Sequence, residues 1–324
     1  MNSLARIDVH THLVPPFWGS ALPSHGGDPS GWSLPKWTAD DHLGYMDKQQ
    51  IATSVLSLTA PSVVGWEGQA RRDMARKVNE YTADLVAKYP TRFGNFATVP
   101  LPDVEGAVLE VEYALDMLKA DGVVLLTNYE GVYLGDKKWA PLWAALNQRS
   151  AVVFIHPGHP IMDLLDGVPG PMVDYPFDTT RNAVHMVLNG VMDNYPNVKI
   201  ILSHAGGFLP YAALRFTLLA ESLNPNGPTA QELNDKFKRF YFDTALSSGP
   251  NALSSLLTFA NHNNILFGSD YPYAPESVAA KFNHILDAET NLTDAQKASF
   301  NRNNGLALFP RLNKGSAGAM PHCF

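Results

Sequence analysis

The 324-residue chain contains a single cysteine, Cys323, one residue from its C-terminus. One cysteine excludes an internal disulfide framework and any zinc site built on several thiolates. A metal ion bound within this chain would therefore need histidine and carboxylate ligands.

Basic residues are also scarce, with 24 Lys and Arg against 31 Asp and Glu, and the formal net charge is −7. Nucleic acids and anionic membranes attract clusters of basic side chains, so we expect neither as a partner. No apolar run approaches the roughly 20 residues that a membrane-spanning helix needs, and the N-terminus lacks a basic segment followed by an apolar one. These absences predict a cytoplasmic protein.

Short runs rich in β-branched residues are abundant, and each is followed by a longer stretch with helical spacing. There are eight such runs, at residues 5–10, 51–58, 93–99, 122–127, 151–156, 198–204, 240–245 and 264–270. Strand and helix alternating eight times is typical of an α/β protein with the (β/α)8 TIM barrel fold. We predict one such barrel over residues 1–312 and a flexible tail over residues 313–324.

The helical spacing is clearest in residues 67–90, where apolar side chains recur every three or four positions. The face they predict consists of Ala70, Met74, Val78, Tyr81 and Leu85. Thr38 is a suitable N-cap for the helix that begins at "ADDHLGYMD". Residues 15–38, rich in Gly, Pro and Trp, separate the first strand from this helix. We predict that they form a long ordered loop that serves as a lid.

Polar residues gather where the predicted strands end, which is the catalytic face of such a barrel. His10 and His12 end the first strand and, being two residues apart, point the same way. The fifth, sixth and eighth strands end with His156, His204 and Asp270. A lone His-x-His motif is weak evidence, but five convergent groups predict a divalent metal site to which Asp270 contributes a hard oxygen ligand.

His204 differs from the other candidates because Gly206 and Gly207 follow it, and glycine lets a backbone approach a ligand closely. We assign it proton transfer and substrate orientation, with a role as a fifth metal ligand as the alternative. His25 in the loop and His159 in "HPGHP" are candidates for substrate contact. Three further histidines lie in helical stretches and are expected to be solvated or packed there: His42, His185 and His284.

Four segments, "DVHTH", "VVFIHP", "ILSHAGGFLP" and "LFGSDYP", resemble the amidohydrolase superfamily. They are most similar to its mononuclear branch, typified by aminocarboxymuconate semialdehyde decarboxylase. The resemblance implies a zinc-type divalent ion, with manganese as the alternative, and no organic cofactor. It implies His10, His12, His156 and Asp270 as ligands and His204 as the catalytic histidine.

The same resemblance gives Arg215, eleven residues after His204, the role of reaching across a dimer interface to a substrate carboxylate. A homodimer is therefore implied, with a tetramer left open. "GGDPSGW", "PKWT", "ADGVVLLTNY" and "YFDTALSS" look closest to 6-methylsalicylate and salicylate decarboxylases. Trp32 and Trp37 then become lid aromatics that pack on a flat substrate, or else anchors of the loop.

Two departures from related enzymes restrict the substrate and the proton relay. His10 and Gly207 occupy positions where several resorcylate-type decarboxylases have glutamate, so the relay differs in detail. Gly44 lies near the position of an arginine that binds a second substrate carboxylate in the muconate enzyme. A substrate with one carboxylate is the simpler expectation.

The resulting hypothesis is metal-dependent, non-oxidative decarboxylation of an ortho-hydroxylated aromatic acid to a phenol and CO2, with Asp270 delivering the proton. One alternative is a metal-dependent hydrolase or hydratase acting on a lactone or amide, because fold alone does not fix the reaction. Another is a catalytically silent barrel that binds aromatic acids as a sensor.

Overall fold

The computed structural model describes residues 5–314. Eight strands form one parallel sheet in the order β1-β2-β3-β4-β7-β8-β9-β10. They are β1 (Arg6–His12), β2 (Ile51–Ser57), β3 (Phe93–Thr98), β4 (Gly122–Leu126), β7 (Val152–His156), β8 (Lys199–Leu202), β9 (Tyr241–Asp243) and β10 (Ile265–Leu266). A small antiparallel hairpin, β5 (Asn128–Tyr129) and β6 (Val132–Tyr133), follows β4.

The sheet closes on itself, because the first strand also contacts the segment that follows the last one. Thr11 forms a parallel bridge with Tyr271, and the Val9 N–H donates to the Phe267 carbonyl at 3.0 Å. The fold is therefore the predicted (β/α)8 barrel, and each of the eight predicted runs overlaps one of its strands.

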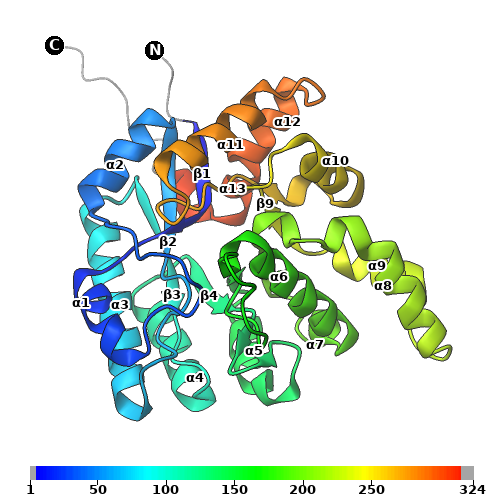
Figure 1. Cartoon of the computed structure of the whole chain (residues 1–324), viewed down its shortest axis with the longest axis horizontal. Coiled ribbons are helices and arrows are strands. Elements are labelled where there is room, and N and C mark those ends of the chain that lie inside the picture. Colours follow the sequence, from blue (N-terminus) through cyan, green and yellow to red (C-terminus); the bar gives the residue numbers. More distant parts are fainter. Residues whose placement is uncertain (1–4, 315–324) are drawn as a thin grey trace.

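Helices surround the strands, with α8 and α9 side by side at the outer edge of the molecule (Figure 1). The α-helices are α1 (Pro16–Ala21), α2 (Ala39–Lys48), α3 (Gly68–Lys88), α4 (Val104–Glu112), α5 (Ala140–Gln148), α6 (Gly170–Leu188), α7 (Val191–Asn194), α8 (Leu209–Leu223), α9 (Ala230–Phe237), α10 (Pro250–Phe259), α11 (Glu276–Ala288), α12 (Asp294–Ala298), α13 (Asn304–Leu308) and α14 (Pro310–Lys314). Shorter turns are η1 (Leu22–His25), η2 (Tyr113–Met117), η3 (Lys137–Trp139), η4 (His204–Gly206), η5 (His262–Asn264) and η6 (Ser299–Asn303).

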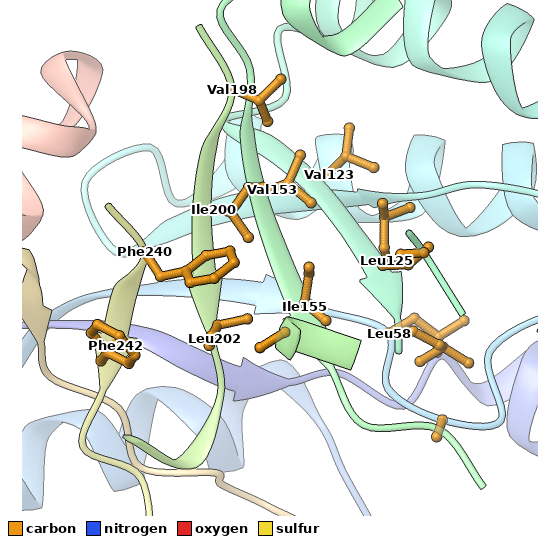
Figure 2. Close-up of a cluster of buried hydrophobic side chains, with 14 of the residues drawn as sticks. Leu58, Val123, Leu125, Val153, Ile155, Val198, Ile200, Leu202, Phe240 and Phe242 are labelled. Carbon is orange, nitrogen blue, oxygen red and sulfur yellow. The ribbon is translucent and has the colours of Figure 1, made fainter. Parts of the chain in front are cut away.

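The strands bury both faces, which explains why they are apolar almost throughout. One set of side chains packs against the helices, and Figure 2 shows ten of them: Leu58, Val123, Leu125, Val153, Ile155, Val198, Ile200, Leu202, Phe240 and Phe242. The alternate positions, such as Val124 and Phe154, fill the barrel interior. Leu308 and Phe309 join this inner cluster, and Gly305 packs against Ile7 near the start of β1. The C-terminal helices thus cover the end of the barrel opposite the histidines.

Local predictions were confirmed in part. The Thr38 side chain caps α2 by accepting the Asp41 N–H. On α3, Val78 is buried, but Ala70 is exposed, and Asn79 occupies part of the buried face. Asn79 is tolerated there because its amide bonds both the N–H and the carbonyl of Thr98, at 2.7 and 2.8 Å.

The first βα loop is more structured than predicted. Its first half is helical, comprising α1 and η1, and Trp18 in α1 is fully buried with its indole N–H donating to the Ser62 carbonyl at 2.8 Å. At the other end of the chain, Asn313 and Lys314 of the predicted tail belong to α14, and residues 315–324 lie outside the described residues. Among residues 5–314, no helix is long and apolar enough to cross a membrane.

Candidate metal centre and active site

The five predicted residues converge at one end of the barrel, although two of them lie beyond the strands. His10, His12 and His156 are strand residues. The expectation that His204 and Asp270 end strands was wrong in detail. His204 begins the turn η4, Asp270 follows β10 by four residues, and both have left-handed backbones, with φ of 53° and 62°. Such φ values cost non-glycine residues roughly 1–2 kcal/mol and are typical of functional sites.

Their side chains surround one point. Asp270 Oδ1 lies 3.3 Å from His10 Nε2 and 3.1 Å from His12 Nε2, and Asp270 Oδ2 lies 3.4 Å from His204 Nε2. The His156 ring centroid is 4.9 Å from that of His12 and 5.3 Å from that of His10. All five side chains are buried.

The tightest group of potential ligands differs from the predicted set by one member. His10, His156, His204 and Asp270 each offer an atom within 4.8 Å of the others. His204 thus stands among the candidate ligands, as the alternative role given to it required, and His12 lies beside the group through its contact with Asp270.

Hydrogen bonds fix how the first two imidazoles are presented. His10 Nδ1 donates to Asp243 Oδ2 at 2.8 Å, and His10 Nε2 makes no hydrogen bond within the described residues. His12 Nδ1 donates to Ser57 Oγ at 2.9 Å, since that hydroxyl donates its own hydrogen to the Thr11 carbonyl. Both Nε2 atoms therefore point at the cluster, where on His10 a bound cation would take the place of a proton. The residues present fit a divalent metal ion.

The charges in the cluster lead to the same conclusion. Burial lowers the pKa of His12 and of His156, so both rings are neutral and can offer a lone pair to a cation. Burial would also lower the pKa of His10, but Asp243 and Asp270 outweigh it and raise the value to about 10. Burial would raise the pKa of Asp270, yet the neighbouring histidines hold it well below its usual range. The site therefore keeps negative charge that a divalent cation would neutralise.

Two supporting carboxylates were not singled out in the sequence. Asp243 ends β9, and besides His10 it accepts the N–H groups of His204 and Ala245, at 3.0 and 2.9 Å. Asp8 accepts the N–H groups of His10 and Ser269, both at 3.1 Å, and burial raises its pKa to about 7. The available signal was their position, because each is an acidic residue within a predicted strand.

A cavity of about 40 Å³ lies against the cluster. His156, His204 and Asp270 line it on one side, and the first βα loop contributes Asp28, Ser30 and Trp32. Its other lining residues are Thr59, Ala60, Pro171, Tyr175, Leu246 and Tyr273.

The loop is held over this cavity by two hydrogen bonds. The Trp32 indole N–H donates to the Tyr273 carbonyl at 3.1 Å, and the Gly170 N–H donates to the Ser30 carbonyl at 2.9 Å. Forty cubic ångströms hold a few water molecules but no aromatic acid, so in this conformation the cavity is too small for such a ligand.

The other residues that were predicted to contact the substrate do not line the metal cavity. Trp37 is in the core, where its indole N–H donates to His42 Nδ1 at 2.9 Å, in keeping with the anchoring alternative. His25 stacks on Trp66 with a centroid separation of 4.3 Å. His159 lines a neighbouring pocket, and Arg215 is exposed on α8.

Gly206 and Gly207, the two glycines after His204, are needed for close packing of the backbone and not, as expected, for its approach to a ligand. Both have left-handed backbones, with φ of 74° and 64°. A Cβ on Gly207 would lie 2.0 Å from the Pro176 carbonyl oxygen, and one on Gly206 would lie 2.9 Å from the Phe242 ring. They allow the turn after β8 to pack against α6 and β9 and so hold His204 in place.

Comparisons with known proteins agree with this geometry. The family model described as Amidohydrolase matches residues 7–311. The 6-methylsalicylic acid decarboxylase of Penicillium expansum is 42% identical over 320 residues, covering 95% of this chain and 97% of its own.

Solved structures are similar as well. The crystal structure of an amidohydrolase II is 32% identical, with a TM-score of 0.88 over 94% of this chain and 100% of its own. The dihydroxybenzoic acid decarboxylase of Polaromonas, solved with bound manganese and the inhibitor 2-nitroresorcinol, is 26% identical. Its TM-score is 0.77, over 96% of this chain and 97% of its own.

Proposed function

The chain belongs to the amidohydrolase family, and we propose from its site that it is a metal-dependent decarboxylase of ortho-hydroxylated aromatic acids of the 6-methylsalicylate type. The observation that carries the proposal is the buried cluster of His10, His156, His204 and Asp270 beside a cavity walled by aromatic rings. The similarity to a fungal 6-methylsalicylic acid decarboxylase supports this choice of substrate.

We propose zinc as the ion, because the ligand set is rich in imidazole nitrogen, and manganese as the alternative, because a related decarboxylase binds it. His10, His12, His156 and Asp270 would hold it, with His204 at its edge. When bound, the ion supplies Lewis acidity toward the ortho oxygen and the carboxylate of the substrate.

The proton moves through Asp270. Direct loss of CO2 would leave an aryl carbanion in the ring plane, outside the π system, so the carboxyl-bearing carbon must be protonated first. Asp270 is held ionised by its histidine neighbours and can accept the phenolic proton. It then delivers this proton to the ring carbon, the carbon–carbon bond breaks, and CO2 and the aromatic phenolate leave.

His204 and the cavity wall orient the substrate. His204 Nδ1 is buried without a hydrogen-bond partner among the described residues, so it is free to bond a substrate oxygen. Trp32 lies on the cavity wall, where an indole can pack on a flat ring.

We further propose a homodimer in which Arg215 of one protomer approaches the substrate carboxylate in the other. Arg215 lies on α8 among large exposed apolar side chains, including Tyr211, Leu214 and Leu218. A soluble protein rarely exposes such a surface unless another molecule covers it.

The deciding experiment incubates the metal-replete protein with salicylate or 6-methylsalicylate in deuterated water. We expect phenol or m-cresol, CO2, and one deuteron at the carbon that carried the carboxylate. His156→Ala should lose metal and activity together, and Asp270→Asn should lose turnover even where metal remains. The exposed His284→Ala serves as control. Ester or lactone hydrolysis without CO2 release would contradict the proposal.

A further inference from the structure

A second pocket of about 330 Å³ lies directly outside the metal cavity. No residue lines both spaces, but two segments of the chain line one space with one residue and the other space with the next. In the first βα loop Asp28 lines the metal cavity and Pro29 lines the outer pocket, and after β2 Ala60 lines the cavity and Pro61 the pocket. The two spaces are therefore neighbours along the first βα loop and along the turn after β2.

The outer pocket suits a small aromatic ring. Its walls include the apolar side chains of Val64, Leu126 and Ile161 and the ring of Tyr129. Its volume is at the lower end of the range for small-molecule sites, and ligand sites are usually apolar with a few polar groups. The metal cavity, at about 40 Å³, is much smaller.

His159 is the polar group that this pocket offers. Its Nδ1 is enclosed by the protein and does not face the pocket, whereas its Nε2 is not enclosed and makes no hydrogen bond within the described residues, so Nε2 is the atom that a pocket ligand can reach. Asn128, the nearby amide, is fully used: its Nδ2 donates to the His159 carbonyl and to Asp178, and its Oδ1 accepts the Gly131 N–H. A hydroxyl bound in the pocket can therefore form a hydrogen bond with His159 Nε2.

The charges around the pocket disfavour an anion. Its lining includes no lysine or arginine, whereas Glu130 lies at its rim and Asp28 lies close enough to His159 to interact with it. A carboxylate would meet two like charges there, but a neutral hydroxyl would not. The pocket therefore fits the neutral phenol better than the anionic acid from which it forms.

We propose that the outer pocket is a binding site for the phenol product, whose ring packs on Val64 and Leu126 and whose hydroxyl bonds His159. This identification of the ligand as product rests on the proposed decarboxylase function. The existence of a phenol-binding site does not depend on that function, because binding of a phenol can be measured without turnover.

The test is calorimetric titration of the metal-replete full-length protein with m-cresol. Val64→Trp fills the pocket and should weaken this binding at least about tenfold. His159→Phe keeps the ring shape but removes the hydrogen bond, and should weaken it about fivefold. Met117→Trp, at an exposed position on another face, should leave it unchanged. Salicylate should not compete for the Val64-dependent site.

The outcomes separate the claims. Binding of m-cresol that is the same in Val64→Trp as in the wild type, or that is absent from the wild type, overturns the proposal. Should Val64→Trp fail to fold, as judged by circular dichroism, the His159→Phe titration decides alone. In turnover, m-cresol should lower kcat as well as raise KM, and Val64→Trp should leave only the effect on KM. A protein that binds m-cresol in the outer pocket but releases no CO2 would refute the enzymatic function and leave the site standing.

Discussion

His10 shows at the level of a single residue how a buried imidazole is prepared as a ligand. Asp243 takes the hydrogen of His10 Nδ1, and the same carboxylate accepts the backbone N–H of His204. One side chain therefore orients two members of the cluster. Partners of this kind typically contribute 10–100-fold to metal affinity.

Asp243→Asn tests this arrangement. The amide can still bond one neighbour, but it loses the charge that holds the proton on His10 Nδ1, so metal affinity should fall by about 10–100-fold. Competition with a chromogenic chelator measures the change. Asp235→Asn, on the exposed surface of α9, is the matched control. Equal affinity in wild type and Asp243→Asn would show that His10 needs no such partner.

His42 is a buried histidine with a structural role. Its Nδ1 accepts the Trp37 indole N–H, and its Nε2 lies 3.2 Å from the Thr11 hydroxyl, between the two histidines of β1. Burial lowers the pKa of His42 to about 3. The unfolded chain, in contrast, takes up this proton near pH 6.5.

Acid should therefore destabilise the fold through His42. Since the unfolded state binds the proton first, the contribution is fully present above about pH 6.5 and is lost as pH falls toward 3. Between pH 6.5 and about pH 5 the loss amounts to about 2 kcal/mol for this one group. Urea unfolding at both pH values measures it, and His42→Gln should show a smaller loss, whereas the exposed His284→Gln should match the wild type. An equal pH dependence in His42→Gln would contradict this assignment.

Among the segments around the cavity, the first βα loop is the one that we expect to open when a ligand enters. After η1 it has no regular structure until α2, and it is tied over the cavity through Ser30 and Trp32. Because few hydrogen bonds hold the loop over the cavity, we expect it to open locally at a free energy well below that of global unfolding.

Trp32→Phe removes the hydrogen bond to the Tyr273 carbonyl and keeps an aromatic ring. One hydrogen bond contributes about 1 kcal/mol, so the opened loop should become about five times more populated. Hydrogen exchange of amides in residues 26–36 should accelerate by that factor, while amides of β4 serve as internal reference. An equal acceleration in β4 would mean that Trp32 stabilises the whole barrel and does not act on the loop alone.

A comparison of the observed strands and helices with the predicted ones shows which elements can be recognised from the sequence. Every strand of the barrel was found, because a buried parallel strand is apolar on both faces and can be recognised from its own residues. The two short hairpin strands β5 and β6 were not predicted. The helix α1 was missed, since six residues are too few to show helical periodicity and Trp18 is held by a tertiary contact. Asp243 was missed for a related reason, because its partner His10 is 233 positions away and nothing local marks the pairing.

At the scale of the whole molecule, the barrel gathers groups from the first, fifth, sixth and last strands at one end. The candidate ligands were therefore predictable once the alternation of strands and helices was recognised. The relative roles of His12 and His204 were not, because the left-handed turn after β8 decides where the second ring points. The role proposed for Arg215 also depends on the whole molecule, since this residue is exposed on α8 and is proposed to meet the substrate of a second protomer.

The proposed dimer can be tested on α8. Leu214 is 69% exposed and adjacent to Arg215, so Leu214→Asp places a charge in the proposed interface without disturbing the core. We expect this variant to sediment as a monomer, to keep its metal content, and to lose most of its turnover because Arg215 no longer reaches the neighbouring site. Met117→Asp changes a residue of the same 69% exposure on another face and should remain dimeric and active. A wild-type protein that sediments as a monomer, or a monomeric Leu214→Asp with full activity, would show that one chain suffices for catalysis.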